Sequence, residues 1–297
     1  MPAEEKGDKV LNRVDRVQLA VPDAEAAARG WISLLGAEKA GEDRIAGLGA
    51  RRLKLRLGNG WVELLSPDGA GRIADAVSAR GAHLYAGGVT ARDMAALRSH
   101  LKGLGVDPLH EGGQLHLDMK DTGIEGLRVV VSPDEDLSPV GDIDFLYEVT
   151  LLSGDTAGVG HALNALFGLD EENYSEIIST VFGYRGTLTL FEKGKLDRLE
   201  VIEPTVPDTT MDRYFRKFGQ SLYMAFAETR DINRITERAK EVSAGHTIDR
   251  PEGRPAHLPS DQLWLHPKAL GGMMLGLSRP SMAWSWSGQP ERVESVD

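Results

Sequence analysis

Four segments of the chain repeat the same order of elements, and this repeat limits the possible folds more than any other feature. Each segment opens with an apolar, strand-like stretch and continues into the i, i+3, i+4, i+7 apolar spacing of an amphipathic helix. Asp stands where an N-cap accepts free amide hydrogens, and Gly stands where a left-handed residue ends a helix. The spacing predicts helices over 23–36, 93–105, 155–168 and 231–245.

Strands with alternating or apolar patterns follow each predicted helix. Residues 51–57 read RRLKLRL, with leucines on one face and a basic stripe of Arg52, Lys54 and Arg56 on the other. This period of two predicts a strand. We expect the stripe to be a solvated sheet face rather than a site for phosphate or carboxylate. Each segment then closes on an apolar strand that ends in proline, at Pro67, Pro133, Pro204 and Pro280.

The repeat therefore predicts an α+β fold of four β-α-β-β-β modules. The modules span 14–67, 82–133, 143–204 and 220–282, and they pair into domains over 14–135 and 143–287. A chain of 297 residues suits two domains. Residues 1–13 are expected to be flexible, 136–142 to form a linker and 288–297 a tail. The polar loop 246–261 is expected to be a lid or a binding loop, and Trp284 and Trp286 to pack back on the second domain.

Composition excludes several classes of site and of partner. The chain has no cysteine, so disulfides, thiolate metal sites and a cysteine nucleophile are excluded. Its formal net charge of −11 argues against a nucleic-acid or anionic-membrane binder. No apolar run approaches a membrane span, and the N-terminus lacks the features of a secretory signal, so we expect a cytoplasmic protein. Phosphate-binding glycine motifs and a Gly-x-Ser-x-Gly elbow are also missing.

Particular stretches resemble modules of the vicinal oxygen chelate superfamily. VDRVQLAVPD (14–23), RRLKLRLGNGWVELLSPDG (51–69) and LWLHPKALGGMMLGLSRP (263–280) resemble methylmalonyl-CoA epimerases and related glyoxalase-like proteins. Four modules in one chain also resemble type I extradiol dioxygenases. The resemblance implies that each pair of modules forms a cup around a divalent metal held by His, Glu or Gln.

The positions implied for metal ligands are mostly occupied by residues that do not bind such metals. In the first domain they hold Arg16, Glu63, Ala86 and Val129 or its neighbour Arg128, and in the second Phe145, Glu200, Met224 and Gly276. Only Glu63 and Glu200 can coordinate a divalent metal well. The resemblance implies a divalent metal as cofactor. Because most of the ligand positions do not fit one, the sequence leaves the cofactor unknown.

Several side chains are candidates for chemistry inside the cups. Glu63 and Glu200 are candidate general bases whose pKa apolar neighbours would raise, with solvent-facing strand residues as the alternative. Arg16 would hold a carboxylate or stabilise an enolate, or only pair with Glu63. The remaining candidates are Tyr85 and Tyr223 as hydrogen-bond donors to substrate, His257 as an acid or base entering the cup from its loop, and His83 and His116 as weaker metal ligands. His83 lies three residues from its implied position and should face away, and His116 shares a strand face with Asp118.

The function predicted from these residues is proton abstraction next to a carbonyl group. The protein would isomerise, epimerise or cleave a small carbonyl or acyl-thioester substrate. Two alternatives remain open: a metal-free ligand-binding protein without catalysis, and an enzyme like the extradiol ring-cleavage dioxygenases. The expected partner is a small molecule, and the modules are compatible with a homodimer because they can pair within a chain or between chains.

Overall fold

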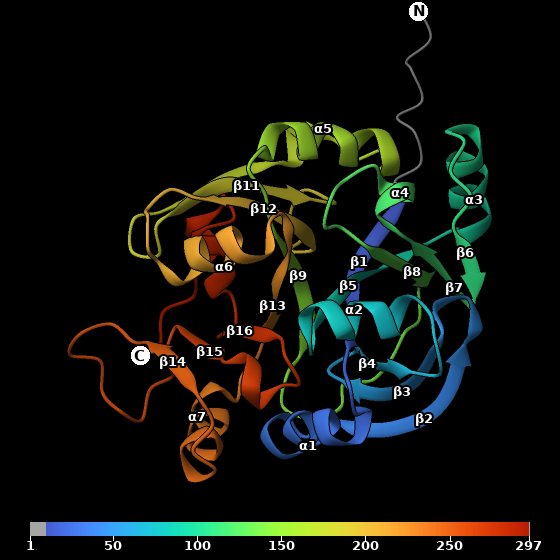
Figure 1. The fold of residues 1–297 in the computed structure, drawn as a ribbon. Coiled ribbons are helices and arrows are strands. Elements are labelled where there is room, and N and C mark those ends of the chain that lie inside the picture. The colour runs from blue at the N-terminus through green and yellow to red at the C-terminus, as the bar shows by residue number, and fades with distance from the viewer. Residues whose placement is uncertain (1–9, 297) are drawn as a thin grey trace, which may run out of the picture.

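The computed structural model describes residues 10–296, in which sixteen strands form two separate sheets (Figure 1). The first sheet comprises β1 (Leu11–Ala20), β2 (Glu38–Ile45), β3 (Ala50–Leu57), β4 (Gly60–Pro67), β5 (His83–Ala91), β6 (Leu109–Glu111), β7 (Gln114–Leu117) and β8 (Val129–Pro133). The second comprises β9 (Phe145–Leu152), β10 (Ser175–Ser179), β11 (Tyr184–Leu190), β12 (Arg198–Pro204), β13 (Ser221–Glu228), β14 (His246–Asp249), β15 (Gln262–Leu265) and β16 (Met274–Ser278).

The two sheets have the same topology. The strand order is β2-β3-β4-β1-β5-β8-β7-β6 in the first and β10-β11-β12-β9-β13-β16-β15-β14 in the second. Within a module the first and last strands run parallel, as β1 and β4 do, and the two modules of a sheet join through antiparallel first strands, β1 and β5. The predicted α+β fold of four β-α-β-β-β modules in two domains is confirmed.

The four predicted helices are present as α1 (Ala24–Leu35), α3 (Met94–Gly103), α5 (Thr156–Phe167) and α7 (Ile232–Glu241). The side chains of Asp23, Asp93 and Asp155 accept hydrogen bonds from first-turn amides, as their N-cap positions predict. The fourth helix differs at both ends. Asp231 makes no capping bond and instead pairs with Arg234 at 3.0 Å, and the left-handed residue after the helix is Ser243, not Gly245.

Three helices lie outside the predicted repeat: α2 (Arg72–Arg80), α4 (Met119–Thr122) and α6 (Thr210–Phe218). Helices α2 and α6 connect the two modules of each domain. They also meet each other, because the Arg80 guanidinium lies 4.5 Å from the Phe218 ring and donates to the Tyr214 hydroxyl at 2.7 Å. Short 3-10 turns complete the chain: η1 (Ala46–Leu48), η2 (Glu171–Asn173), η3 (Pro267–Ala269), η4 (Met282–Ser285) and η5 (Pro290–Arg292).

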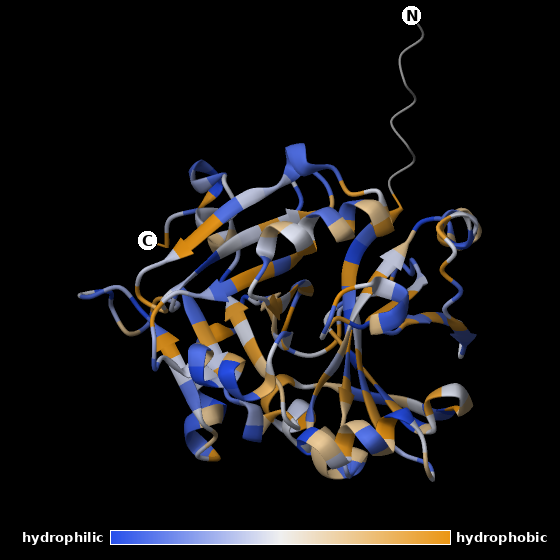
Figure 2. Cartoon of the chain, turned by 45° about the horizontal axis from the view of Figure 1, so that its top comes forward, coloured by the Kyte–Doolittle hydropathy of each residue, from blue (hydrophilic) through white to orange (hydrophobic). Residues whose placement is uncertain are grey.

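One hydrophobic core lies between the two sheets and includes residues from both domains. Val17 and Leu19 of β1 point into it beside Trp31 of α1, together with Val149 and Leu151 of β9. Figure 2 shows apolar residues along the strands in the middle of the molecule. Helix α1 packs beside α7, and the side chain of His100 in α3 contacts the Leu166 carbonyl of α5 at 3.1 Å. The sheets therefore stand back to back, and their concave faces form two cups that open outward.

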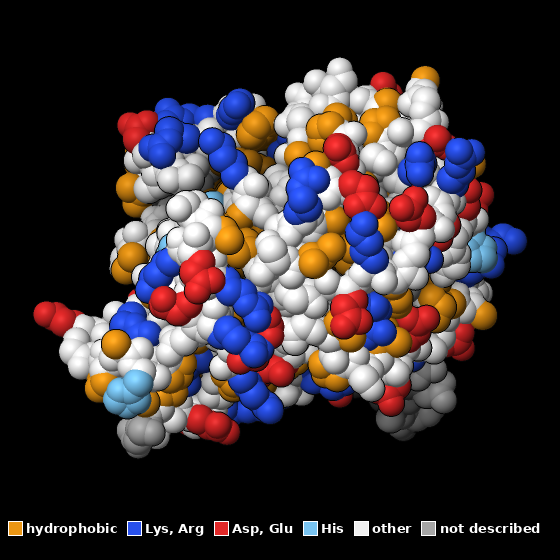
Figure 3. Space-filling model, turned by 90° about the horizontal axis from the view of Figure 1, so that it is seen from below, with side chains coloured by type: hydrophobic (Ala, Val, Ile, Leu, Met, Phe, Trp, Pro, Cys, Tyr) orange, Lys and Arg blue, Asp and Glu red, His pale blue; other side chains and the backbone are white. Residues whose placement is uncertain are grey.

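The two domains interlock where α1 meets the turn that contains η3. A Cβ atom on Gly30 would lie 1.7 Å from the Ala269 carbonyl oxygen, so only glycine allows this approach. The neighbouring Trp31 donates its indole N–H to the Leu270 carbonyl at 3.2 Å. The face that carries α1 and α7 bears basic and acidic side chains next to one another (Figure 3).

The ends and the linker differ in detail from the sequence-based boundaries. Strand β1 begins at Leu11, inside the segment expected to be flexible, while residues 1–9 of that segment lie outside the described residues. The predicted linker 136–142 is anchored to both domains. Val140 pairs with Gly58 beside the first sheet, and Asp142 forms ion pairs with Arg234 and Arg238 of the second domain. No helix within residues 10–296 is long and apolar enough to span a membrane.

Candidate functional site

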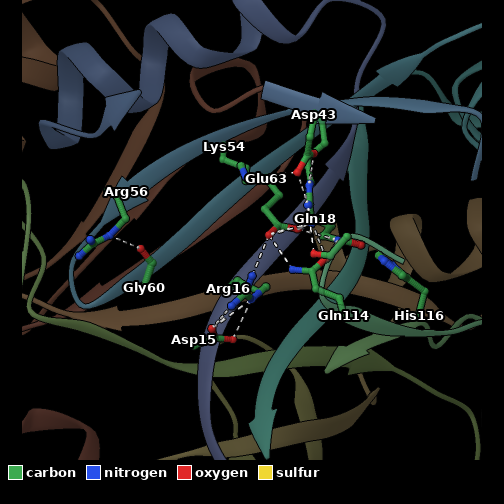
Figure 4. A network of polar contacts seen from close by, with 12 residues as sticks. Asp15, Arg16, Gln18, Asp43, Lys54, Arg56, Gly60, Glu63, Gln114 and His116 are labelled. Atoms are coloured by element: carbon green, nitrogen blue, oxygen red, sulfur yellow. Dashed lines mark hydrogen bonds and ion pairs between the residues drawn. The ribbon is translucent and has the colours of Figure 1, made fainter. Parts of the chain in front are cut away.

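The cup of the first domain contains a buried polar network centred on Glu63 (Figure 4). One carboxylate oxygen of Glu63 accepts from Arg16 at 2.8 Å and from the Gln114 amide at 2.8 Å. The other accepts from the Gln18 amide at 2.7 Å, and Arg52 lies 3.5 Å from both oxygens. The groups that donate to this carboxylate are therefore all side chains of the cup itself.

The two arginines of this network bind further acidic groups. Arg16 lies between Glu63 and Asp15, whose carboxylate contacts the guanidinium at 2.5–3.1 Å. Arg52 pairs with Asp43 at 2.6 Å, and it is only 2% exposed. The expectation of a solvated basic stripe is therefore wrong for Arg52. The sheet curls, so the face that looks outward in a flat strand becomes the inside of the cup.

The charge of Glu63 is fixed by these neighbours. Burial alone would raise the pKa of Glu63, but Arg16 and Arg52, with the amides of Gln18 and Gln114, lower it below its usual value. The direction is opposite to the one expected from its apolar sequence neighbours. Leu64 points into the core on the other side of the sheet. Glu63 is therefore an ionised, fully bonded carboxylate.

The other candidates of the first cup lie at its opposite side. Tyr85 is the extra residue of a β-bulge, since Ala86 pairs with Gln18 and Leu84 with Leu19. The Arg128 guanidinium lies 4.6 Å from the Tyr85 ring. The bulge changes which residues of β5 point to which face of the sheet. His83 therefore lies beside Tyr85, with ring centroids 6.4 Å apart, and does not face away as expected.

Both candidate histidines of this cup are neutral near pH 7. Burial lowers the pKa of His83 and of His116 to about 4. His116 contacts the Glu111 carbonyl at 3.3 Å and lines a cavity of about 10 Å³ together with Gln18 and Tyr85. This is room for about one water molecule. Within residues 10–296 the Gln18 Oε1 atom has no hydrogen-bond partner.

The strand register identifies the equivalent residues of the second cup. Glu200 lies opposite Thr150 as Glu63 lies opposite Gln18, so the two glutamates occupy equivalent positions. Arg16 pairs with Trp61 as Glu148 pairs with Arg198. The counterpart of Arg16 is therefore Glu148 and not Phe145, because the start of β9 is offset from the start of β1.

The equivalent glutamate has a different environment in the second cup. Glu148 binds Arg198 at 2.6 Å, and the Thr150 hydroxyl lies 3.1 Å from Glu148 and 2.7 Å from Glu200. All four side chains are buried. Burial, and then the charge of Glu148, raise the pKa of Glu200 well above its usual value. Glu200 therefore favours its protonated form.

Aromatic side chains fill the remainder of the second cup. The Phe226 ring lies 6.0 Å from Tyr147, 6.3 Å from Trp264 and 6.2 Å from Trp286 of the C-terminal segment. Trp284 is also buried here, as the alternation of the tail predicts. Tyr223 is the bulge residue equivalent to Tyr85, and its ring lies 5.0 Å from Tyr214 of α6.

The two cups are closed at their rims by different interactions. In the first, the Glu111 carboxylate accepts hydrogen bonds from the Ala46 and Gly47 amides at 2.7 and 2.8 Å. In the second, the Phe182 ring at the tip of the equivalent hairpin lies 5.2 Å from Trp264. The first rim is thus bridged by charge-assisted hydrogen bonds and the second by a ring contact.

A groove of about 450 Å³ runs beside the second cup, where the C-terminal segment crosses the end of β9. Its lining includes Phe145, Leu196, Trp284, Asp197 and Glu228. Burial raises the pKa of Asp197 to about 7, although its carboxylate accepts the Val14 amide of the first domain at 2.8 Å. The loop candidate His257 lies elsewhere. It is exposed, and its carbonyl is contacted by Asn233 of α7, on the side of the sheet opposite the cup.

The residues of neither cup fit a resident divalent metal. Within residues 10–296, no three His, Asp or Glu side chains are grouped so that they could hold a metal. In the first cup a guanidinium stands at one ligand position, and Ala86 and Val130 stand at two others. The register aligns Val130, rather than Val129 or Arg128, with Gly276. In the second cup Met224 and Gly276 leave only Glu148 and Glu200 at the ligand positions, where Glu148 already binds Arg198 and both glutamates contact Thr150.

Sequence reasoning missed more than half of the residues that build the two networks. The residues not among the candidates are Asp15, Gln18, Asp43, Gln114, Glu148, Thr150 and Arg198. Arg198 precedes Glu200 by two residues, and Gln18 follows Arg16 by two. Counting by twos along those strands would have found both.

Comparisons with known proteins identify the fold of this arrangement. A triple mutant of 4-hydroxymandelate synthase from Streptomyces coelicolor matches 96% of this chain and 100% of its own, with a TM-score of 0.67 and 14% identity. A fusion of a xylose isomerase-like TIM barrel with 4-hydroxyphenylpyruvate dioxygenase matches 91% of this chain and 50% of its own, with a TM-score of 0.63 and 14% identity.

The sequence itself matches no family model and no curated protein. At 14% identity the structural matches establish the fold and leave the reaction open. Together with the two eight-stranded curled sheets, they show that this chain has the two-domain fold of the vicinal oxygen chelate superfamily.

Proposed function

We propose that the second cup binds a small carbonyl compound and moves a proton on the carbon next to its carbonyl group. The observation that carries this proposal is the buried pair of Glu148 and Glu200, which share the hydroxyl of Thr150, while Arg198 binds Glu148. Two carboxylates this close cannot both ionise easily, so the pair holds one proton between them. The first cup offers no such group, because Glu63 is fully bonded and ionised.

The pair supplies the acid and the base that such a reaction needs. Glu148, which binds Arg198, takes the proton from the carbon, and the electron pair of that C–H bond moves into the carbonyl group. Glu200 gives its proton to the carbonyl oxygen, and an enol forms. Return of a proton to either carbon or either face completes an isomerisation.

Arg198 is suited to stabilise the oxygen during this step. Its Nε binds Glu148 and its Nη1 binds the Leu196 carbonyl, whereas Nη2 is buried and has no hydrogen-bond partner among the described residues. A buried donor without a partner is energetically unfavourable. A carbonyl or enolate oxygen in the cup would satisfy it, and the stabilisation would be largest when negative charge develops.

Substrate access requires a rearrangement of the aromatic cover. Glu200 is 4% exposed, and Phe226, Trp264 and Trp286 fill the cup. At the rim, Phe182 is 41% exposed and contacts Trp264 through its ring, without a hydrogen bond. We therefore place the opening between the β10–β11 hairpin and β15.

Solvent deuterium exchange tests the proposal directly. We would incubate a panel of 2-oxo acids, 2-hydroxy ketones and acyl thioesters with the protein in D₂O and follow loss of the C–H signal by NMR. We expect exchange with at least one compound, and at least a hundredfold slower exchange with Glu200→Gln. The matched control is Glu203→Gln, a partly exposed glutamate of the same strand that pairs with Arg185. Exchange that survives Glu200→Gln unchanged would contradict the assignment of the pair.

A non-catalytic ligand-binding protein is the second candidate, and the first cup favours it. There the equivalent glutamate is bonded to groups that leave it no chemical role. A compound that raises the melting temperature of the protein, with no exchange in any test compound, would support this function. The residues of the two cups fit a metal poorly. An extradiol-type ring cleavage therefore has no support beyond the shared fold.

A further inference from the structure

We infer that the guanidinium of Arg16 is a built-in cation that takes the place of a divalent metal in the first cup. In this arrangement the cup keeps oxygen atoms of the kind that bind a cation. The Arg16 side chain balances their negative charge. The inference is independent of any reaction in the second cup.

The first support is the position of the guanidinium between two buried carboxylates. Arg16 contacts Glu63 at 2.8 Å and Asp15 at 2.5 Å, and these two carboxylates are 0% and 3% exposed. Two buried carboxyl groups therefore face one guanidinium of charge +1. Arg52 contributes only from 3.5 Å and is itself paired with Asp43.

The second support is the room that the backbone leaves for this side chain. A Cβ atom on Gly88 of β5 would lie 1.9 Å from Cγ of Arg16, so the arginine stem occupies the space of a missing side chain. Phe226 stands at the equivalent position of the second cup, where Glu148 replaces Arg16. The glycine and the arginine form a matched pair that exists only in the first cup.

The third support is an amide oxygen without a partner. Gln18 is fully buried, its amide nitrogen binds Glu63, and its Oε1 atom has no hydrogen-bond partner among residues 10–296. Carboxylate and amide oxygens are the ligands that hard divalent cations prefer. Removal of the guanidinium would leave the Asp15 and Glu63 carboxyl groups around a space without a cation, with the Gln18 amide bound to the same glutamate.

The test is to remove the built-in cation and offer a free one. We would measure thermal unfolding of Arg16→Ala with and without Mn²⁺ or Ca²⁺, and count bound Mn²⁺ by electron paramagnetic resonance. We expect Arg16→Ala to melt lower than the wild type, to bind about one Mn²⁺, and to regain several degrees of melting temperature when the ion is added. The wild type should show neither binding nor a shift.

The control removes a ligand as well as the cation. The double variant Arg16→Ala, Glu63→Gln should lose the response to Mn²⁺, because one of the two carboxylates is gone. Should Arg16→Ala not accumulate as folded protein, it would be refolded from urea with Mn²⁺, with Ca²⁺ or with neither. Recovery that depends on the divalent ion supports the inference. No Mn²⁺ binding by the folded variant, or no ion-dependent recovery on refolding, overturns it.

Discussion

Glu63 and Glu200 show that equivalent residues can have opposite electrostatic character. Both sit at the same register on the last strand of a first module, and both are buried. Glu63 faces two arginines and two amide donors, whereas Glu200 faces a second carboxylate and a hydroxyl group. The neighbours, and not the position in the fold, decide whether the carboxyl group is charged.

The same substitution at these two positions should therefore have different effects on stability. Glu63→Gln leaves Arg16 and Arg52 buried without their shared partner, and we expect it to cost about 3–5 kcal/mol. Glu200→Gln replaces a largely protonated carboxyl group by a neutral amide that can still accept from Thr150, and we expect a change under about 1 kcal/mol at pH 7. Urea unfolding measured by circular dichroism would distinguish them. Equal losses would contradict the assigned charges.

Asp197 provides a prediction about pH. Its pKa in the folded protein is raised to about 7, so between the ordinary value of 3.8 and about 7 the folded state binds a proton that the unfolded state has lost. Stability from this group is therefore present at low pH and is lost as pH rises toward 7 and above. Asp197→Asn should stabilise the protein by about 1–2 kcal/mol more at pH 8 than at pH 4. Melting curves at both values would check this, and a constant difference would argue against it.

The candidate residues could be predicted better than their roles. The family resemblance placed Arg16 and Glu63 in one cup, and the close contact between them was foreseen as an alternative. The pKa of Glu63 was not, because Gln18 and Gln114 come from strands whose register the sequence does not specify. His83 was placed on the wrong face because a bulge at Tyr85 cannot be seen in the alternation pattern.

At the scale of the elements, local signals decided which predictions succeeded. The helices α1, α3 and α5 carry an Asp cap, and their apolar faces pack into the shared core. Helices α2 and α6 were missed because they interrupt the repeat and present few apolar residues. Each buries a single hydrophobic residue fully, Ile73 and Met211. A repeat-based prediction finds what the modules share and overlooks the connections between them.

Two glycines test how closely the elements pack. Gly103 ends α3 and has open space around a Cβ atom, so Gly103→Ala should stabilise the protein by about 0.5–1 kcal/mol. Gly88 lies against Arg16, so Gly88→Ala should destabilise it by about 1–3 kcal/mol. Chemical denaturation of the two variants gives both numbers. A neutral Gly88→Ala would mean that Arg16 can leave its place in the cup.

At the scale of the molecule, the two domains share one core and fixed contacts across their boundary. Trp31→Phe would keep most of the packing but remove the hydrogen bond to the Leu270 carbonyl. We expect a loss of about 1–2 kcal/mol, felt equally by both sheets. Hydrogen exchange followed by mass spectrometry would compare protection of β1 with that of β9. Faster exchange confined to the first sheet would show that the domains unfold separately.

The contacts across the boundary also bear on how such a protein can evolve. Asp197 of the second domain binds the Val14 amide, and the Leu270 carbonyl binds Trp31. Each domain therefore has a hydrogen-bonding group whose partner belongs to the other domain. Selection that keeps one cup folded therefore also keeps the other folded, so the side chains inside the second can change without loss of its domain.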